Sequence, residues 1–233
     1  SVAELAMGHM FSCARYISIA GHTMREDKWE KKAYGKGIEL QGKTLGIVGF
    51  GRIGQHLGVM AKAIGMKVVA FDIFHIPGIE EQLGIPYVEM DELLAMSDFV
   101  SVHAPAVDGG ALISAENIAK MKDGVVFIDN ARGELMDIDA VTEAVESGKF
   151  GALFMDAFPG ETGIIHVPHD EDIIRTPGMP YFKLKYLRSF VNVYHTPHMA
   201  FFTEEAAEQM AECGVNSIYE ILTEGKSKHE IPC

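Results

Sequence analysis

The feature that most constrains the fold is a glycine-rich turn set between an apolar run and a helical pattern. Residues 45–48 are apolar, and helical periodicity runs on to Ala63. Between them stand glycines spaced as G-x-G-x-x-G, namely Gly49, Gly51 and Gly54. The pattern predicts a strand, a turn too tight for side chains, and a helix that begins on the turn.

Each glycine of this turn has an expected role. Gly49 makes the turn, Gly51 lets a pyrophosphate approach the backbone, and Gly54 lets the helix pack close to the strand. The first helical turn contains Arg52 and Ile53 and offers unpaired N–H groups at the positive end of the helix dipole. An anionic diphosphate is therefore the expected guest.

A second apolar run, residues 68–71, ends on Asp72. A carboxylate at this point can accept hydrogen bonds from both hydroxyls of a ribose, and it would repel a 2′-phosphate. The alternative is that Asp72 merely opens a loop. Because the strand before the turn, the helix after it and the acid all occur together, the pattern favours an NAD site over an ordinary turn and over NADP.

Charge and cysteine content narrow the function classes. The net charge of −13 argues against non-specific binding of nucleic acid, whose phosphates would be repelled. Three widely spaced cysteines give no disulfide framework, which fits a reducing cytoplasm. Arg15 interrupts the apolar N-terminal stretch, so neither a signal peptide nor a membrane span is expected. The cysteines are Cys13, Cys213 and Cys233.

The rest of the chain alternates between short apolar runs and helical patterns. This alternation predicts an α/β fold, a Rossmann-type doubly wound parallel sheet with helices on both faces. Residues 157–189 are rich in Pro, Gly and His and are expected to be irregular. Further strands are expected at 87–88, 99–103, 125–129, 152–155 and 191–194, and helices at 91–96, 114–121, 137–147 and 203–222.

The N-terminal helix is expected to run from Ser1, as cap, to about Thr23, with Glu4 completing a capping box. Apolar residues cover most of its circumference, so it must be buried on several sides. A sheet covers only one side. A partner subunit, a missing lobe and a wholly internal position are all open explanations for the surplus apolar face. Residues 24–43 are expected to form a surface connector.

Four polar side chains are expected at the carboxyl ends of strands, where ligands bind in such sheets. Arg132 could grip a carboxylate through two parallel hydrogen bonds. His198 could exchange protons if a carboxylate fixed its tautomer, and Glu161 is the candidate partner. From the residues alone, a catalytic trio and three solvated loop residues are evenly balanced. The four strand-end residues are His103, Arg132, Asp156 and His198.

A second group of histidines invites a metal interpretation. His166 and His169 lie close in sequence to Asp170 and Asp172. They fall in the irregular segment and lack a fixed frame of ligands, so solvent exposure is favoured and no metal site is expected.

Taken together, the motifs resemble the D-isomer-specific 2-hydroxyacid dehydrogenases. The resemblance runs from the N-terminal helix to the last helix. It implies that Arg132 binds the substrate carboxylate, that His198 exchanges a proton with the 2-oxo oxygen, and that Glu161 holds the imidazole in its donating state. The motifs are the glycine turn, Ser101–Pro105, Ala131–Leu135, Gly151–Asp156 and Thr196–Ala200.

The same resemblance implies NAD as cofactor, a 2-oxo or 2-hydroxy acid as substrate, and a homodimer formed through the N-terminal helix. It implies a dimerisation helix over 1–30, a nucleotide domain over 31–222 and a tail over 223–233. Asp156 would lie near the nicotinamide carboxamide. Beyond the glycine turn and Asp72, the implied cofactor contacts are His103, Ala104, Pro105, Asn130, Ala131, Arg132, Asp156 and His198.

Three departures limit what the resemblance implies. The substrate-binding lobe of the family is expected to be absent from this chain, and the loop at 106–111 is unusually glycine-rich. The 37 residues from Glu161 to His198 are closer to the D-lactate and D-2-hydroxyisocaproate branch, whereas Lys28-Trp29 is closer to phosphoglycerate dehydrogenase. Open alternatives are therefore phosphoglycerate dehydrogenase-type activity, a non-catalytic dimeric NAD-binding module and a nucleotide-sensing regulator.

Overall fold

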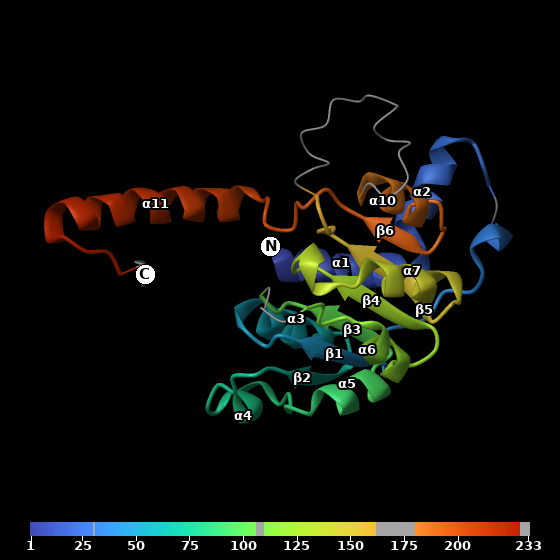
Figure 1. The fold of residues 1–233 in the computed structure, drawn as a ribbon, viewed down its shortest axis with the longest axis horizontal. Helices are drawn as coiled ribbons and strands as arrows, with labels where there is room; N and C mark the ends of the chain where they lie inside the picture. Colours follow the sequence, from blue (N-terminus) through green and yellow to red (C-terminus); the bar gives the residue numbers. More distant parts are fainter. Residues whose placement is uncertain (30, 106–109, 162–179, 229–233) are drawn as a thin grey trace.

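The chain folds around one parallel sheet, whose strands are all connected by crossovers (Figure 1). The structure is a computed structural model that describes residues 1–29, 31–105, 110–161 and 180–228. The six strands lie in the order β2-β1-β3-β4-β5-β6, and every neighbouring pair is parallel. This confirms the predicted doubly wound α/β sheet. The strands are β1 (Thr44–Val48), β2 (Lys67–Phe71), β3 (Phe99–Val102), β4 (Val125–Asp129), β5 (Phe150–Met155) and β6 (Val193–His195).

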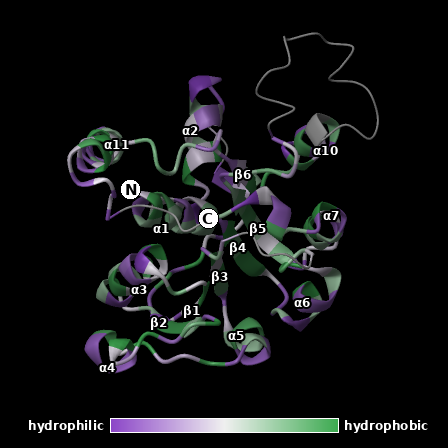
Figure 2. Ribbon diagram, turned by 60° about the vertical axis from the view of Figure 1, so that its left-hand side comes forward, coloured by the Kyte–Doolittle hydropathy of each residue, from purple (hydrophilic) through white to green (hydrophobic). Residues whose placement is uncertain are grey.

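Helices cover both faces of the sheet and give it two separate cores (Figure 2). On one face α1 (Val2–Arg15) and α3 (Arg52–Ala63) pack against side chains such as Ile47 and Phe154. The other face is covered by α5 (Met90–Met96), α6 (Ala115–Lys120) and α7 (Ile138–Glu146). The central strands are buried on both faces, which is why they read as nearly continuous apolar runs.

The predicted N-terminal helix is two helices rather than one. Tyr16 ends α1 in the left-handed region (φ 57°), and α2 (Ile17–Arg25) begins directly after it. The hydroxyls of Ser12 and Ser18 hydrogen-bond across the break at 2.7 Å. Such side chains compete with the backbone for hydrogen bonds. The expected capping box does not form either, because the Ser1 side chain makes no capping bond.

Two short helices occur where the sequence predicted no helix. α4 (Ile79–Leu83) is a single turn bounded by Gly78 and Gly84, both at positive φ. α10 (Pro180–Leu187) lies inside the segment expected to be irregular. Tyr87 makes only an isolated bridge to Ala70 rather than a strand. The histidines and aspartates between His166 and Asp172, where no metal site was expected, lie outside the described residues. Within the described residues no cluster of metal-binding side chains occurs.

The closing helix α11 (Glu204–Glu224) begins where predicted, with Thr203 as its cap. It extends away from the body of the molecule, and none of its residues is buried (Figure 1). No helix within the described residues combines the length and the apolar character needed to span a membrane.

Candidate active site

The glycine turn has the geometry that its spacing predicts. Gly49 has a φ of 92°, and a Cβ added there would lie 2.5 Å from the backbone N of Ala104. A Cβ on Gly54 would lie 2.3 Å from the carbonyl oxygen of Gly49, so α3 packs directly on the turn. A Cβ on Gly51 would meet nothing within 4 Å. The open side of the turn is thus at Gly51, where the N-terminus of α3 also has no side-chain cap.

Asp72 lies immediately past β2 and is tied to this turn. Its Oδ2 accepts a hydrogen bond from the N–H of Phe50 at 2.6 Å, and its Oδ1 accepts one from the N–H of Phe74 at 3.0 Å. These bonds fix the carboxylate beside the glycine turn. Since each carboxylate oxygen has two lone pairs, acceptor capacity remains for the hydroxyls of a ribose.

Further along the same edge, buried polar atoms lack partners. The Nδ1 of His103 and both side-chain amide atoms of Asn130 are buried without a hydrogen bond to any described residue. The other ring nitrogen of His103, Nε2, hydrogen-bonds to Ser101 Oγ at 2.8 Å. Buried polar groups are normally satisfied, so unpaired ones beside an open edge fit a polar ligand. The open space at Gly51, the fixed carboxylate of Asp72 and the unpaired buried atoms of His103 and Asn130 together fit NAD.

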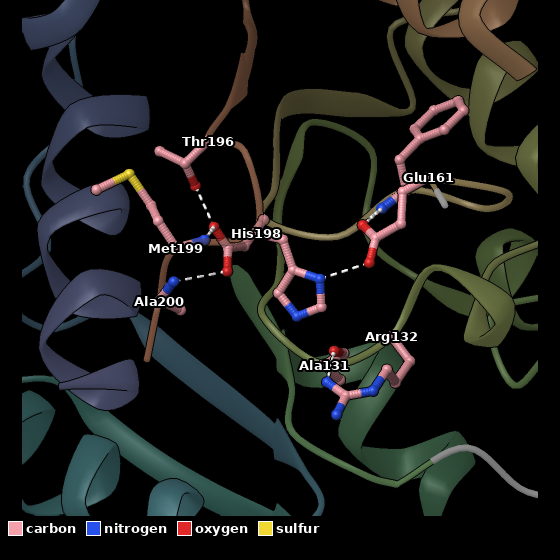
Figure 3. A network of polar contacts seen from close by, with 9 residues as sticks. Ala131, Arg132, Glu161, Thr196, His198, Met199 and Ala200 are labelled. Atoms are coloured by element: carbon pink, nitrogen blue, oxygen red, sulfur yellow. Dashed lines mark hydrogen bonds and ion pairs between the residues drawn. The ribbon is translucent and has the colours of Figure 1, made fainter. Parts of the chain in front are cut away.

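His198 and Glu161 form a direct pair (Figure 3). The imidazole Nδ1 lies 2.5 Å from Glu161 Oε1, and both side chains are partly buried. The other oxygen of Glu161 accepts a hydrogen bond from the N–H of Phe158 at 3.1 Å, which fixes the orientation of the carboxylate. The bond at Nδ1 leaves Nε2 of His198 to face away from Glu161 (Figure 3). That is the arrangement needed to present a proton to a ligand.

Asp156 holds the loop that carries His198. Its Oδ1 accepts hydrogen bonds from the Thr196 hydroxyl and from the N–H of Met199, and its Oδ2 accepts one from the N–H of Ala200 at 2.8 Å. Its carbonyl accepts from the N–H of His198 at 2.8 Å. These bonds hold His198 at a φ of 51°, a region that few non-glycine residues occupy. The carboxylate is thus largely occupied by the protein, and its expected contact with nicotinamide stays a prediction.

Arg132 reaches the same edge from β4. It is exposed, its Nη1 donates to the carbonyl of Ala131 at 2.9 Å, and no carboxylate among the described residues pairs with it. A Cβ on Gly133 would lie 2.2 Å from the carbonyl carbon of Phe158, so this loop packs tightly against the turn that leads to Glu161. In Figure 3 the guanidinium lies on the side of the imidazole that does not face Glu161.

The remaining predicted positions also line this edge. Ala104 and Pro105 follow β3 directly, Ala131 precedes Arg132, and Arg52 and Ile53 begin α3. A cavity of about 130 Å³ is lined by His198 and Glu161 together with His195 and Leu184. Sequence reasoning placed Thr196 and Gly133 within the family-like motifs but assigned neither of them a role. Neither carries a local signal, since their importance comes from contacts with distant residues.

Three partly buried histidines predict how stability depends on pH. Burial lowers the pKa of His9, His103 and His195 to about 4 each. In the unfolded chain these histidines bind a proton at about pH 6.5, whereas in the folded chain they stay neutral down to about pH 4. Each histidine therefore removes about 3 kcal/mol of stability as the pH falls through that window. Burial raises the pKa of Asp129 to about 7. Asp129 therefore stabilises the fold as the pH falls, and it offsets the destabilisation from about one of the three histidines.

We expect the urea midpoint to fall steeply between pH 7 and pH 5, with about two net protons taken up on unfolding. His9 stacks on Phe154 in the core, with ring centroids 3.6 Å apart, and its burial lowers its pKa. His9→Leu removes this titrating group and should therefore reduce the proton uptake on unfolding by about one. A midpoint that does not change over this range would contradict the expectation.

Comparison with known proteins places this geometry in a family. Residues 7–200 match the family model described as the NAD-binding domain of D-isomer-specific 2-hydroxyacid dehydrogenases. A hydroxypyruvate reductase of Thermotoga maritima is 42% identical over 226 residues, which is 96% of this chain and 66% of that protein. The chain thus spans slightly less than two thirds of that relative's length.

Two solved structures extend the comparison. The pyruvate reductase of Chlamydomonas reinhardtii superposes with a TM-score of 0.89 at 37% identity, over 98% of this chain and 68% of that one. A D-lactate dehydrogenase from Aquifex aeolicus, solved with NAD and lactic acid, superposes with a TM-score of 0.85 at 28% identity, over 99% and 70%. The chain therefore belongs to the D-isomer-specific 2-hydroxyacid dehydrogenase family and carries the NAD-binding domain of that family.

Proposed function

We propose that the protein transfers a hydride between NAD(H) and a D-2-hydroxy acid or its 2-oxo acid. The observation that carries this proposal is the direct His198–Glu161 pair at the same sheet edge as Arg132. A domain that only bound a nucleotide would need neither the pair nor the exposed arginine beside it.

The proposed roles follow from the side-chain chemistry. Arg132 binds the substrate carboxylate through parallel N–H···O bonds and draws electron density from the 2-oxo group. His198 delivers a proton from Nε2 to the 2-oxo oxygen, and in the reverse direction accepts one from the hydroxyl. Glu161 accepts a hydrogen bond from the Nδ1–H group, which keeps the ring oriented and leaves Nε2–H to donate. When bound, NADH supplies the hydride for the substrate carbon.

NAD is proposed to lie along the edge from the glycine turn toward His198, with the diphosphate at Gly51 and a ribose at Asp72. The fixed Asp72 carboxylate disfavours a 2′-phosphate. His103 and Asn130 are proposed to use their unpaired atoms on the far half of the cofactor. Asp156 is proposed to act mainly through His198. The proposed limits are a helical segment over 1–30, a nucleotide domain over 31–222 and a tail over 223–233.

The proposal is tested by mixing the full-length protein with NADH and a panel of 2-oxo acids, and following the loss of nicotinamide absorbance. We expect turnover with pyruvate-like or hydroxypyruvate-like acids. Turnover that requires a phosphorylated substrate would favour the phosphoglycerate dehydrogenase-type alternative. Tight NADH binding without turnover of any acid would support a non-catalytic module and overturn the proposal.

A homodimer through α1 and α2, in the cytoplasm, completes the proposal. Large apolar side chains are exposed on these helices, with Ile17 at 56% and Met24 at 47% of their full exposure. Such surfaces on a soluble protein commonly mark an interface. The free cysteines Cys13 and Cys213 fit a reducing compartment.

We expect Ile17→Glu combined with Met24→Glu to convert a dimer into monomers in sedimentation velocity, because two buried charges would oppose association. Val59→Glu, at a comparably exposed position on α3, is the matched control and should leave the dimer intact. A wild-type protein that sediments as a monomer would dismiss the interface.

A further inference from the structure

Asp129 is an acid in a place where acids are rarely found. It is the last residue of β4, is fully buried, and lies in register between Val102 of β3 and Met155 of β5. Side chains alternate along a strand, so its carboxyl lies on the same face as Phe127, in the core beneath α6 and α7. An ionised carboxylate in such surroundings is costly unless it is paired.

The hydrogen bonds of Asp129 lead directly to Arg132. Its Oδ1 accepts from the N–H of Ala131 at 2.9 Å, which closes a tight turn at the end of the strand. Its carbonyl accepts from the N–H of Asp156 at 2.9 Å. Its Oδ2 is buried and has no partner among the described residues. The turn thus sets the direction in which the chain leaves β4, one residue before the arginine.

Three acidic side chains act on Asp129 electrostatically. Asp156 follows β5, Glu134 lies in the short helix η2 (Gly133–Leu135), and Glu161 lies in the turn packed against Gly133. No lysine or arginine of the described chain forms an ion pair with it. Burial raises the pKa of Asp129 to about 7, the hydrogen bond from Ala131 opposes this, and the three neighbouring acids reinforce it.

We propose that Asp129 is a positioning residue for Arg132, which as an uncharged acid holds the turn that directs the guanidinium toward the carboxylate of a 2-oxo acid. This inference rests on the proposed function of Arg132. Once ionised, Asp129 adds a negative charge beneath the loop, attracts the guanidinium and repels the incoming carboxylate. The affinity for the 2-oxo acid therefore falls as Asp129 loses its proton.

Asp129→Asn in the full-length protein is the primary test, because asparagine keeps the Oδ1 acceptor but cannot ionise. At pH 6 we expect KM for the 2-oxo acid, kcat and the Kd of NADH to be within about twofold of wild type. Between pH 6 and pH 8 the ratio of wild-type KM to variant KM should rise at least fivefold. A constant ratio would overturn the proposal.

Asp129→Ala tests the turn itself. At pH 6, where Asp129 of the wild type is uncharged, loss of the Oδ1 acceptor should raise KM for the 2-oxo acid about tenfold, while the Kd of NADH is unchanged. An unaltered KM would remove the positioning role.

Unfolding in urea supplies a readout that does not depend on activity. The unfolding constant of the wild type, relative to Asp129→Asn, should rise about tenfold per pH unit between pH 4.5 and pH 6.5, because unfolding then releases the extra proton. A ratio that stays constant overturns the proposal. If the full-length protein turns over no 2-oxo acid, the proposed function fails, and this comparison still decides whether Asp129 is buried uncharged.

Discussion

Replacing His198 with glutamine in the full-length protein should lower turnover of 2-oxo acids about 10³-fold, while the Kd of NADH stays within about twofold of wild type. Glutamine can still donate a hydrogen bond, but it has no proton to transfer at neutral pH. The cofactor contacts proposed along the glycine turn lie at the other strands and are untouched. Stopped-flow absorbance for turnover and fluorescence titration for NADH separate the two effects.

His56→Gln, at an exposed position on α3, is the matched control and should retain wild-type turnover. Glu161→Gln should cost less turnover than His198→Gln, because it removes the carboxylate that orients the ring but leaves the ring in place. If His198→Gln keeps more than a tenth of wild-type turnover, His198 is not the proton donor.

The second large effect is expected at the glycine turn, where two substitutions of the same size should act on different properties. Gly54→Ala should lower the free energy of unfolding by about 2–4 kcal/mol, because its Cβ would lie 2.3 Å from the backbone oxygen of Gly49 and α3 would have to shift. Gly51→Ala should change stability by less than about 1 kcal/mol, because its Cβ meets nothing within 4 Å.

For NADH affinity we expect the larger effect at Gly51 rather than at Gly54. The open space at Gly51 is where the diphosphate is proposed to approach the backbone, so Gly51→Ala should weaken NADH binding about 10- to 100-fold without loss of stability. Urea unfolding and fluorescence titration of both variants check the pair. Unchanged NADH affinity in Gly51→Ala would place the diphosphate elsewhere.

The strands and the turn could be predicted from the sequence because their signals are local. A buried parallel strand such as Val125–Asp129 is apolar throughout, and glycine spacing alone determines where α3 can begin. The break at Tyr16 could not be predicted, since it depends on a hydroxyl contact between Ser12 and Ser18 that exists only after the chain turns.

The candidate site was less accessible to such reasoning. Glu161 and His198 are 37 residues apart, and no periodicity relates them, so the residues alone left their pairing evenly balanced. The resemblance to a family implied that these two residues act as a pair, and their catalytic roles remain predictions. Asp129 was visible as the polar end of an apolar strand, but its missing partner could be seen only once the neighbouring strands were in place.

The bonds made by Asp156 have a consequence for hydrogen exchange. The amide hydrogens of three consecutive residues, His198, Met199 and Ala200, are all bound by this one residue at the end of β5. Because Asp156 is itself bonded to β4 through its N–H, these amides should exchange more slowly than those of the exposed loops. The segment bearing the imidazole is therefore expected to open less readily than its loop conformation suggests.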